Sequence, residues 1–75
     1  MPARATPQIP ISFLRLPAVR LRTGLPRATL YSLMQRGEFP RPISLGGRSV
    51  AWVNTDIERW MLSRVSASRR SAPRA

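Results

Sequence analysis

The sequence predicts a mainly α-helical domain with a small β-hairpin, arranged as a winged helix-turn-helix: helix-turn-helix, two-stranded wing and C-terminal helix. Three observations support this prediction. Two short helical segments are separated by Thr23-Gly24-Leu25-Pro26, a Gly-Gly pair marks a later hairpin turn, and a helical apolar stripe follows the hairpin. The order helix, helix, hairpin, helix is the order that this fold requires.

Length and charge narrow the class of protein. The 75 residues make one small domain at most, and they carry a formal net charge of +10. Every basic residue is arginine. A strongly positive field attracts phosphate polymers, so nucleic acid is the expected partner. No stretch approaches the roughly 20 apolar residues of a membrane span, and the helical segments are too short and interrupted for a membrane-surface helix.

Few side chains could perform chemistry. The chain has no His and no Cys, and its three acids are Glu38, Asp56 and Glu58. A disulfide framework and a cysteine-based zinc site are therefore excluded, and we expect no cofactor and no metal. Helix capping explains Asp56 and Glu58 better than catalysis, so we expect a binding protein and not an enzyme. With no signal peptide in evidence, it is expected in the cytoplasm, associated with the nucleoid.

Composition divides the chain into three parts. Residues 1–10 contain three prolines and little that could pack, which predicts a disordered N-terminal arm. Residues 66–75 are rich in Ser, Ala and Arg and predict a disordered basic tail. The folded domain is then 11–65. Both tails are expected to add salt-sensitive affinity for DNA without specificity.

The first two helices are delimited by proline and glycine. A short extended lead-in at 11–16 precedes a helix over 17–23, with Pro17 in its first turn and Gly24 as its left-handed end. A second helix is predicted over 26–36, with Gly37 after it. Its apolar stripe consists of Leu30, Leu33 and Met34.

The predicted wing follows a stretch that two prolines keep extended. Strand 43–45 leads into Gly46-Gly47, which can supply the positive φ angles of a tight turn. The return strand is 48–53, with Val50 and Trp52 expected on one face. Trp52 then belongs to the core.

The last predicted helix begins at Thr55. Thr55 and Glu58 have the spacing of a capping box, in which each side chain bonds a free backbone N–H at the start of the helix. The buried stripe expected for this helix is Ile57, Trp60, Met61 and Val65.

The outward face of helix 26–36 carries polar side chains that could reach base edges or phosphates. Arg can bond guanine through two hydrogen bonds, Gln can do so with adenine, and hydroxyls mostly bond phosphate. Tyr31 has an alternative role at the edge of the core, and surface arginines are often merely solvated. The predicted DNA-binding residues are Arg27, Thr29, Tyr31, Ser32, Gln35 and Arg36 on the helix, with Arg41 and Arg48 on the wing.

Several motifs resemble those of AlpA-family prophage regulators over roughly residues 12–65. The motifs are Phe13-Leu14-Arg15-Leu16-Pro17, Arg22-Thr23-Gly24-Leu25, Arg27-Ala28-Thr29-Leu30-Tyr31, Arg36-Gly37-Glu38-Phe39-Pro40-Arg41-Pro42, Leu45-Gly46, Val50-Ala51-Trp52 and Asp56-Ile57-Glu58-Arg59-Trp60. The resemblance implies a winged helix-turn-helix related to the MerR DNA-binding domain and to phage excisionases, with its recognition helix at 27–36 and its wing at 41–50. The family usually has Ser where this chain has Pro26, so a hydroxyl N-cap and a phosphate contact are absent here.

Three functions fit these features. The first is a sequence-specific, double-stranded DNA-binding transcriptional regulator of a prophage or integrative element. It reads the major groove with helix 26–36 and the backbone or minor groove with wing 41–50. The second is an excisionase, a recombination directionality factor that bends DNA at an attachment site. The third, from another class, is a protein-binding adaptor or anti-repressor with an acidic partner. Further partners implied by these functions are integrase, RNA polymerase and other copies of the chain, which would assemble cooperatively on DNA from monomers.

Overall fold

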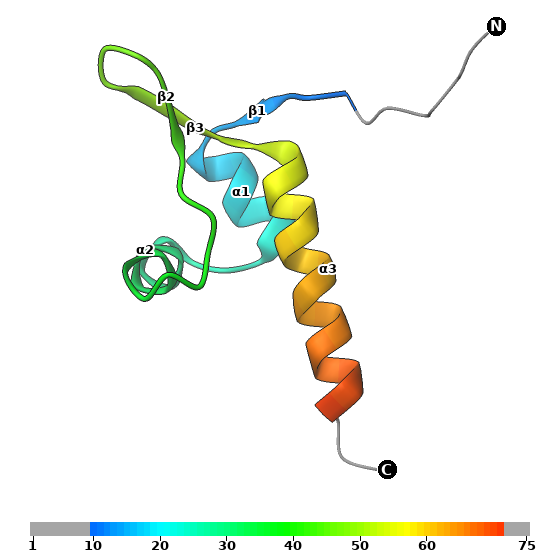
Figure 1. The fold of residues 1–75 in the computed structure, drawn as a ribbon. Coiled ribbons are helices and arrows are strands. Elements are labelled where there is room, and N and C mark those ends of the chain that lie inside the picture. Colours follow the sequence, from blue (N-terminus) through cyan, green and yellow to red (C-terminus); the bar gives the residue numbers. More distant parts are fainter. Residues whose placement is uncertain (1–9, 72–75) are drawn as a thin grey trace, which may run out of the picture.

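Three helices and three short strands make up residues 10–71, the part of the chain that the computed structural model describes (Figure 1). This architecture confirms the predicted winged helix-turn-helix. None of these helices is long and apolar enough to span a bilayer. The elements are β1 (Phe13–Leu14), α1 (Leu16–Thr23), α2 (Arg27–Gln35), β2 (Ile43–Gly46), β3 (Ser49–Val53) and α3 (Asn54–Ser71).

The strands form an antiparallel sheet in the order β1-β3-β2. The lead-in predicted as extended is therefore a third strand beside the wing. Asn54 holds the lead-in to the sheet through two hydrogen bonds. Its backbone N–H donates to the Ser12 carbonyl at 2.9 Å, and its side-chain oxygen accepts from the Ser12 N–H at 2.7 Å. The Asn54 amide nitrogen also donates to the carbonyl of Pro10 at 3.0 Å. Of the arm predicted over residues 1–10, only Pro10 lies within the described residues.

The turn between α1 and α2 forms as predicted. Gly24 has φ +75°, and its N–H donates to the carbonyl of Arg20 at 2.8 Å. The Thr23 hydroxyl donates to the carbonyl of Val19 and accepts from the N–H of Leu25. Pro26 occupies the N-cap of α2 with extended backbone, so the helix begins one residue later than predicted.

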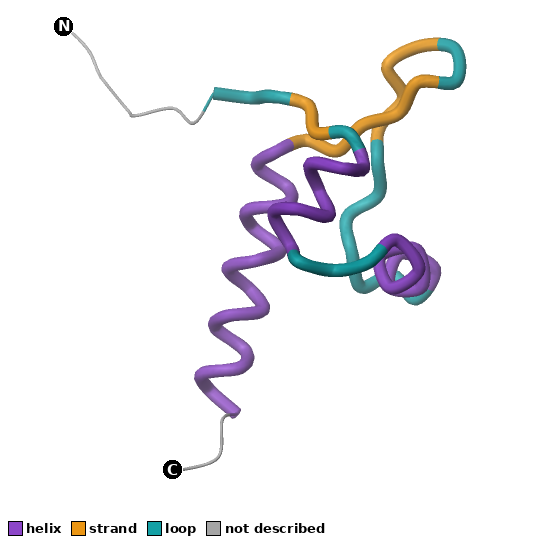
Figure 2. Tube along the Cα trace, turned by 180° about the vertical axis from the view of Figure 1, so that it is seen from behind, coloured by secondary structure: helices purple, strands orange, loops and turns teal. Residues whose placement is uncertain are grey.

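One core joins all three helices to the sheet. In Figures 1 and 2, α2 is seen end-on whereas α1 and α3 run across the view, so the core fills the corner between crossing helices. The half-buried residues packed around it include Leu25 of the turn between α1 and α2. The buried cluster consists of Val19, Leu30, Met34, Phe39, Trp52 and Ile57.

Both tryptophans hold the loop between α2 and β2. The indole Nε1 of Trp52 donates to the Pro40 carbonyl at 3.0 Å, and that of Trp60 donates to the Glu38 carbonyl at 2.7 Å. Phe39, between the two acceptors, is buried with its ring edge-on to Trp60 at 4.8 Å between centroids. The foot of the wing is thus fixed relative to α2 by hydrogen bonds and packing together.

The wing differs from the prediction in its turn, and its two faces are buried unequally along β3. Its turn is Gly47-Arg48, because Gly46 pairs with Ser49 and Leu45 is an extra residue that makes a β-bulge. Val50 and Trp52 lie on one face of β3 as expected, but Val50 is exposed while Trp52 is buried. The reason is that the wing projects beyond the helices, so the core covers only the end of β3 near β1 (Figure 1).

The start of α3 also differs. The helix already includes Asn54 and Thr55, so Thr55 is not the N-cap residue of the predicted capping box. The Glu58 carboxylate instead accepts a 2.9 Å bond from Arg22, which links α3 to α1. Asp56 lies in the first turn, where a negative charge favours the helix.

The end of α3 extends beyond the predicted domain boundary. The helix continues to Ser71, whereas the sequence predicts a disordered tail from residue 66; residues 72–75 lie outside the described part. Val65, expected in the buried stripe, is exposed because no other element of residues 10–71 packs against this half of the helix (Figure 1). Local bonds support the extension, including one from Arg70 to the Ser66 hydroxyl at 2.8 Å.

Candidate nucleic-acid interface

The outward face of α2 is polar and accessible. Its inward residues, Leu30 and Met34, are buried in the core. At 3.6 residues per turn, the residues on the opposite side of the helix must therefore point to solvent. The exposed residues on that side are Ala28, Tyr31, Ser32 and Gln35.

Arg27 lies over the ring of Tyr31, one turn along α2. The guanidinium carbon is 5.3 Å from the ring centroid, within the range of a cation–π contact. Tyr31 is 39% exposed, so it lies at the rim of the outward face and not in the core. Of the two alternatives that the sequence left for Tyr31, the structure therefore favours the surface position. The ring orders the arginine, which reduces the conformational entropy lost when a ligand binds.

A shallow groove separates α2 from the foot of the wing. Its lining includes Tyr31 and Gln35 from the helix and Arg41 and Pro42 from the loop. Because the tryptophan hydrogen bonds fix that loop, Arg41 has a defined position beside the helix. The structure thus brings together predicted site residues from the helix and from the foot of the wing.

The remaining predicted residues lie around this groove. Arg48 is exposed in the turn at the tip of the wing. Arg36 follows the end of α2 and is 3.8 Å from Glu38, in an exposed ion pair too weak to hold it in one orientation. Ser32 is exposed, whereas Thr29 is half-buried on the flank of the helix away from Tyr31. Thr29 is therefore the least accessible of the eight.

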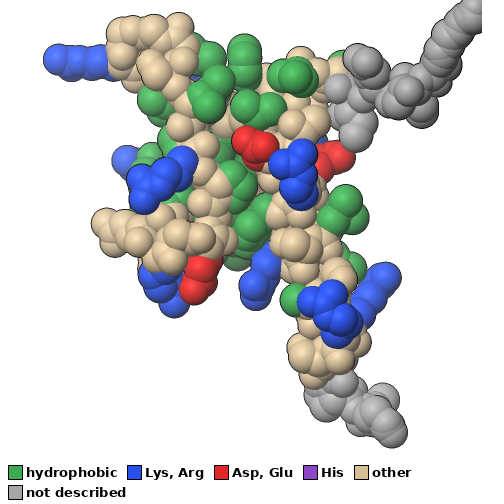
Figure 3. Space-filling model, viewed as in Figure 1, with side chains coloured by type: hydrophobic (Ala, Val, Ile, Leu, Met, Phe, Trp, Pro, Cys, Tyr) green, Lys and Arg blue, Asp and Glu red, His purple; other side chains and the backbone are tan. Residues whose placement is uncertain are grey.

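Positive charge also surrounds the outward face of α2 and the wing. Figure 3 shows arginine atoms at the tip of the wing, beside α2, next to the acidic atoms on the first half of α3 and at the far end of α3. Within residues 10–71, no group of three or more His, Cys, Asp or Glu side chains is arranged to hold a metal ion. The exposed arginine, hydroxyl and amide side chains of this surface can form hydrogen bonds and attract negative charge.

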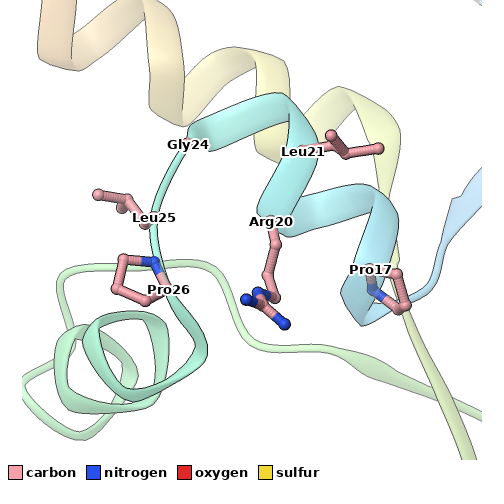
Figure 4. A pocket seen from close by; sticks show the side chains of 6 residues that line it. All are labelled: Pro17, Arg20, Leu21, Gly24, Leu25 and Pro26. Atoms are coloured by element: carbon pink, nitrogen blue, oxygen red, sulfur yellow. The ribbon is translucent and has the colours of Figure 1, made fainter.

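A hollow at the helix-turn-helix corner contains Arg20, which is not among the predicted DNA-binding residues. It is lined by Arg20 and Leu21 of α1 and by the turn from Gly24 to Pro26 (Figure 4). Arg20 points from α1 into this gap, beside the start of α2. Pro26 provides no side-chain cap, so the first backbone N–H groups of α2 remain available to an anion. The feature of the sequence that could have identified Arg20 is its position one turn before Gly24, which ends α1.

Comparison with known proteins gives matches over most of the chain. The family model described as "Prophage CP4-57 regulatory protein (AlpA)" matches residues 12–65. The chain is 41% identical to "Uncharacterized protein ORF88" of Enterobacteria phage P4, over 92% of this chain and 85% of that protein. It is 37% identical to "DNA-binding transcriptional activator AlpA" of Escherichia coli (strain K12), over 72% of this chain and 86% of that protein.

Proposed function

The chain belongs to the AlpA family of prophage regulatory proteins, and on this premise we propose that it is a transcriptional regulator that binds double-stranded DNA. The observation that carries the proposal is the groove in which Gln35 of α2 and Arg41 of the wing foot adjoin. The relative in Escherichia coli that is named as a DNA-binding transcriptional activator supports the same conclusion. The regulator acts in the cytoplasm, at the DNA of a prophage or integrative element.

In this proposal, the outward face of α2 enters the major groove. That groove is about 12 Å wide and admits one α-helix. Gln35 can bond the two exposed edge atoms of adenine, and Arg27 can bond those of guanine. Tyr31 supports Arg27 from below, since the guanidinium already lies over its ring. Ala28 is small enough for a close approach of the helix to the bases and can contact a thymine methyl group.

Phosphate contacts at both ends of α2 orient the helix in the groove. At its start, the free backbone N–H groups and the nearby Arg20 suit one phosphate of the backbone. At its end, Arg36 can exchange its weak pairing with Glu38 for a phosphate. The hydroxyls of Ser32 and Thr29 add neutral contacts that carry no sequence information.

The wing contacts the DNA beside the helix. Arg41 at its foot meets the backbone next to the major-groove contact, and Arg48 at its tip reaches the adjacent backbone or minor groove. A narrow minor groove over A·T-rich sequence concentrates negative potential and favours an inserted arginine. The wing therefore adds affinity and a preference for groove shape.

Gel-shift titration tests this function with the full chain. The probes are the DNA around its own gene, the DNA around a neighbouring integrase gene, and random DNA, each at two salt concentrations. We expect a specific complex that survives the higher salt while random binding is lost. Equal, salt-sensitive binding to all probes would mean that charge alone drives the contact. Absence of binding at low salt would refute the proposal in favour of an adaptor that binds an acidic protein.

Footprinting and in vitro assays then separate regulation from excision. Protection at a promoter, together with a change in transcript level, is the result expected for a regulator. Protection confined to an attachment site, with DNA bending and stimulated excision, would assign the chain to recombination directionality instead.

A further inference from the structure

The second half of α3 projects from the domain and carries an apolar strip. Leu62 is 68% exposed and Val65 is 44% exposed, although both are aliphatic. Figure 1 shows this half of the helix running away from the rest of the chain. The exposure comes from the position of the strip beyond the core, and neither β-sheet nor helix covers it in residues 10–71.

Charged residues of opposite sign flank the strip. Glu58 lies one turn before Leu62, and Arg69 lies one turn after Val65. At 3.6 residues per turn, all four residues fall within a sector of about 60° on the helix surface. Along this face of the helix, the order of residues is therefore Glu58, Leu62, Val65 and Arg69.

This order is self-complementary when a second helix runs in the opposite direction. A two-fold axis midway between Leu62 and Val65 brings each of them against the other in the second copy. The same axis brings Glu58 of one copy against Arg69 of the other, because Glu58 and Arg69 are equally far along the helix from the axis. Both charge pairs and both apolar pairs then form at once.

Two shallow hollows adjoin the apolar strip, one toward each of its ends. One shallow hollow is lined by Glu58, Met61, Leu62 and Val65. Its neighbour is lined by Leu62, Val65, Ser66, Arg69 and Arg70. In the antiparallel pair, each hollow of one copy faces the other hollow of the second copy, so the aliphatic side chains of each copy can fill the hollows of the other.

We propose that two copies of this chain pair through antiparallel contact of their α3 helices, centred on Leu62 and Val65. Glu58 then accepts from Arg22 of its own chain and from Arg69 of the other copy, since only one of its carboxylate oxygens is used by Arg22. A carboxylate can accept several hydrogen bonds. The pairs between Glu58 and Arg69 favour the antiparallel orientation of the two helices. The contact between Leu62 and Val65 stabilises their association by burying apolar surface.

The pairing is weak in free solution. The strip is far smaller than the roughly 800 Å² per partner of a standard interface. On DNA, two adjacent copies have a high effective concentration, so the same contact produces cooperative binding. This consequence rests on the proposed DNA-binding function. Because a two-fold axis relates the copies, they would occupy half-sites in inverted orientation, whereas simple stacking side by side would occupy direct repeats.

Sedimentation equilibrium of the free protein tests the pairing without DNA. We expect the average mass of the full chain to rise between about 0.1 and 1 mM, while L62S/V65S remains monomeric over this range. Ile11→Ser is the matched control, because Ile11 is 69% exposed but lies outside the strip; it should behave as the wild type. A wild-type mass that stays monomeric up to 1 mM, or an equal rise in L62S/V65S, would overturn the proposal.

Charge reversal tests the antiparallel direction. R69E and E58R should each reduce association, and the double variant E58R/R69E should restore it. Arg70→Glu makes the same charge change about 100° away on the helix and should have the smaller effect. If the double variant associates no better than the single ones, the antiparallel register is wrong. Circular dichroism of each variant confirms that α3 remains helical.

A final comparison uses two copies of the footprinted half-site, in inverted or direct orientation. Cooperative binding should occur on the inverted pair and be lost in L62S/V65S, with unchanged affinity for a single half-site. Cooperativity that L62S/V65S retains would contradict the pairing. Failure to bind a single half-site would refute the proposed function alone, because the sedimentation result decides the pairing independently.

Discussion

The indole nitrogen of Trp60 donates a 2.7 Å hydrogen bond to the backbone carbonyl of Glu38. This bond ties α3 to the loop that follows α2, and Phe39 packs edge-on against the same indole. The loop leads directly to Arg41 at the foot of the wing. The distance between the two proposed DNA-contacting elements therefore depends on a residue that is remote from both in the sequence.

Replacing Trp60 by Phe should remove this hydrogen bond while keeping most of the ring contact. The expected loss in free energy of unfolding is about 1 kcal/mol, the typical net value of one hydrogen bond. Urea unfolding followed by circular dichroism measures it. Arg59→Ala, next to Trp60 on the exposed side of α3, is the control and should change stability by less. Equal stability of W60F and the wild type would show that the hydrogen bond is dispensable.

Gly24→Ala should destabilise the helix-turn-helix through its backbone. An added Cβ at Gly24 meets nothing within 4 Å, so crowding is not the cause. The φ of +75° is unfavourable for alanine by about 1–2 kcal/mol. Gly24→Asn is the matched comparison, because Asn tolerates the left-handed region better and should lose less. Thermal unfolding of the three proteins gives the order, and a G24A variant as stable as the wild type would contradict it.

Gln35→Ala should reduce discrimination between target and random DNA. Loss of a base-edge contact costs about 1–3 kcal/mol on the target sequence, with little effect on random DNA. Gln35 is exposed, so the fold should be unaffected. Gel-shift titrations of both DNAs measure the ratio. Ser68→Ala on the projecting half of α3 is the control, and an equal loss on both DNAs would show that Gln35 does not read sequence.

Arg48→Ala should weaken binding to all DNA sequences and lower its salt dependence. Removal of one phosphate contact reduces the slope of log affinity against log salt by about 0.9. The same change at Arg59, which is exposed on α3 and is not among the proposed DNA contacts, serves as the control for net charge. Fluorescence anisotropy at several salt concentrations gives both slopes. If the two variants have the same slope as the wild type, the wing tip does not contact phosphate.

Local patterns in the sequence were sufficient for most of the helix-turn-helix. Gly24 and Gly37 both have the positive φ that ends a helix, at +75° and +73°. Leu30 and Met34 are buried as their spacing predicts. These features depend on residues a few positions apart, whose conformational preferences act before any tertiary contact forms. The positive charge and the polar outward face of α2 follow directly from residue type and helical period.

Tertiary structure decided the features that join distant segments. Whether the lead-in becomes β1 depends on Asn54, some 40 residues away, and the position of Arg41 depends on Trp52 and Trp60. The exposure of Val50 and Val65 follows from how far the wing and α3 extend past the core. Periodicity identifies an apolar stripe, but burial also requires a neighbour to cover it, and only the folded chain determines where its elements meet.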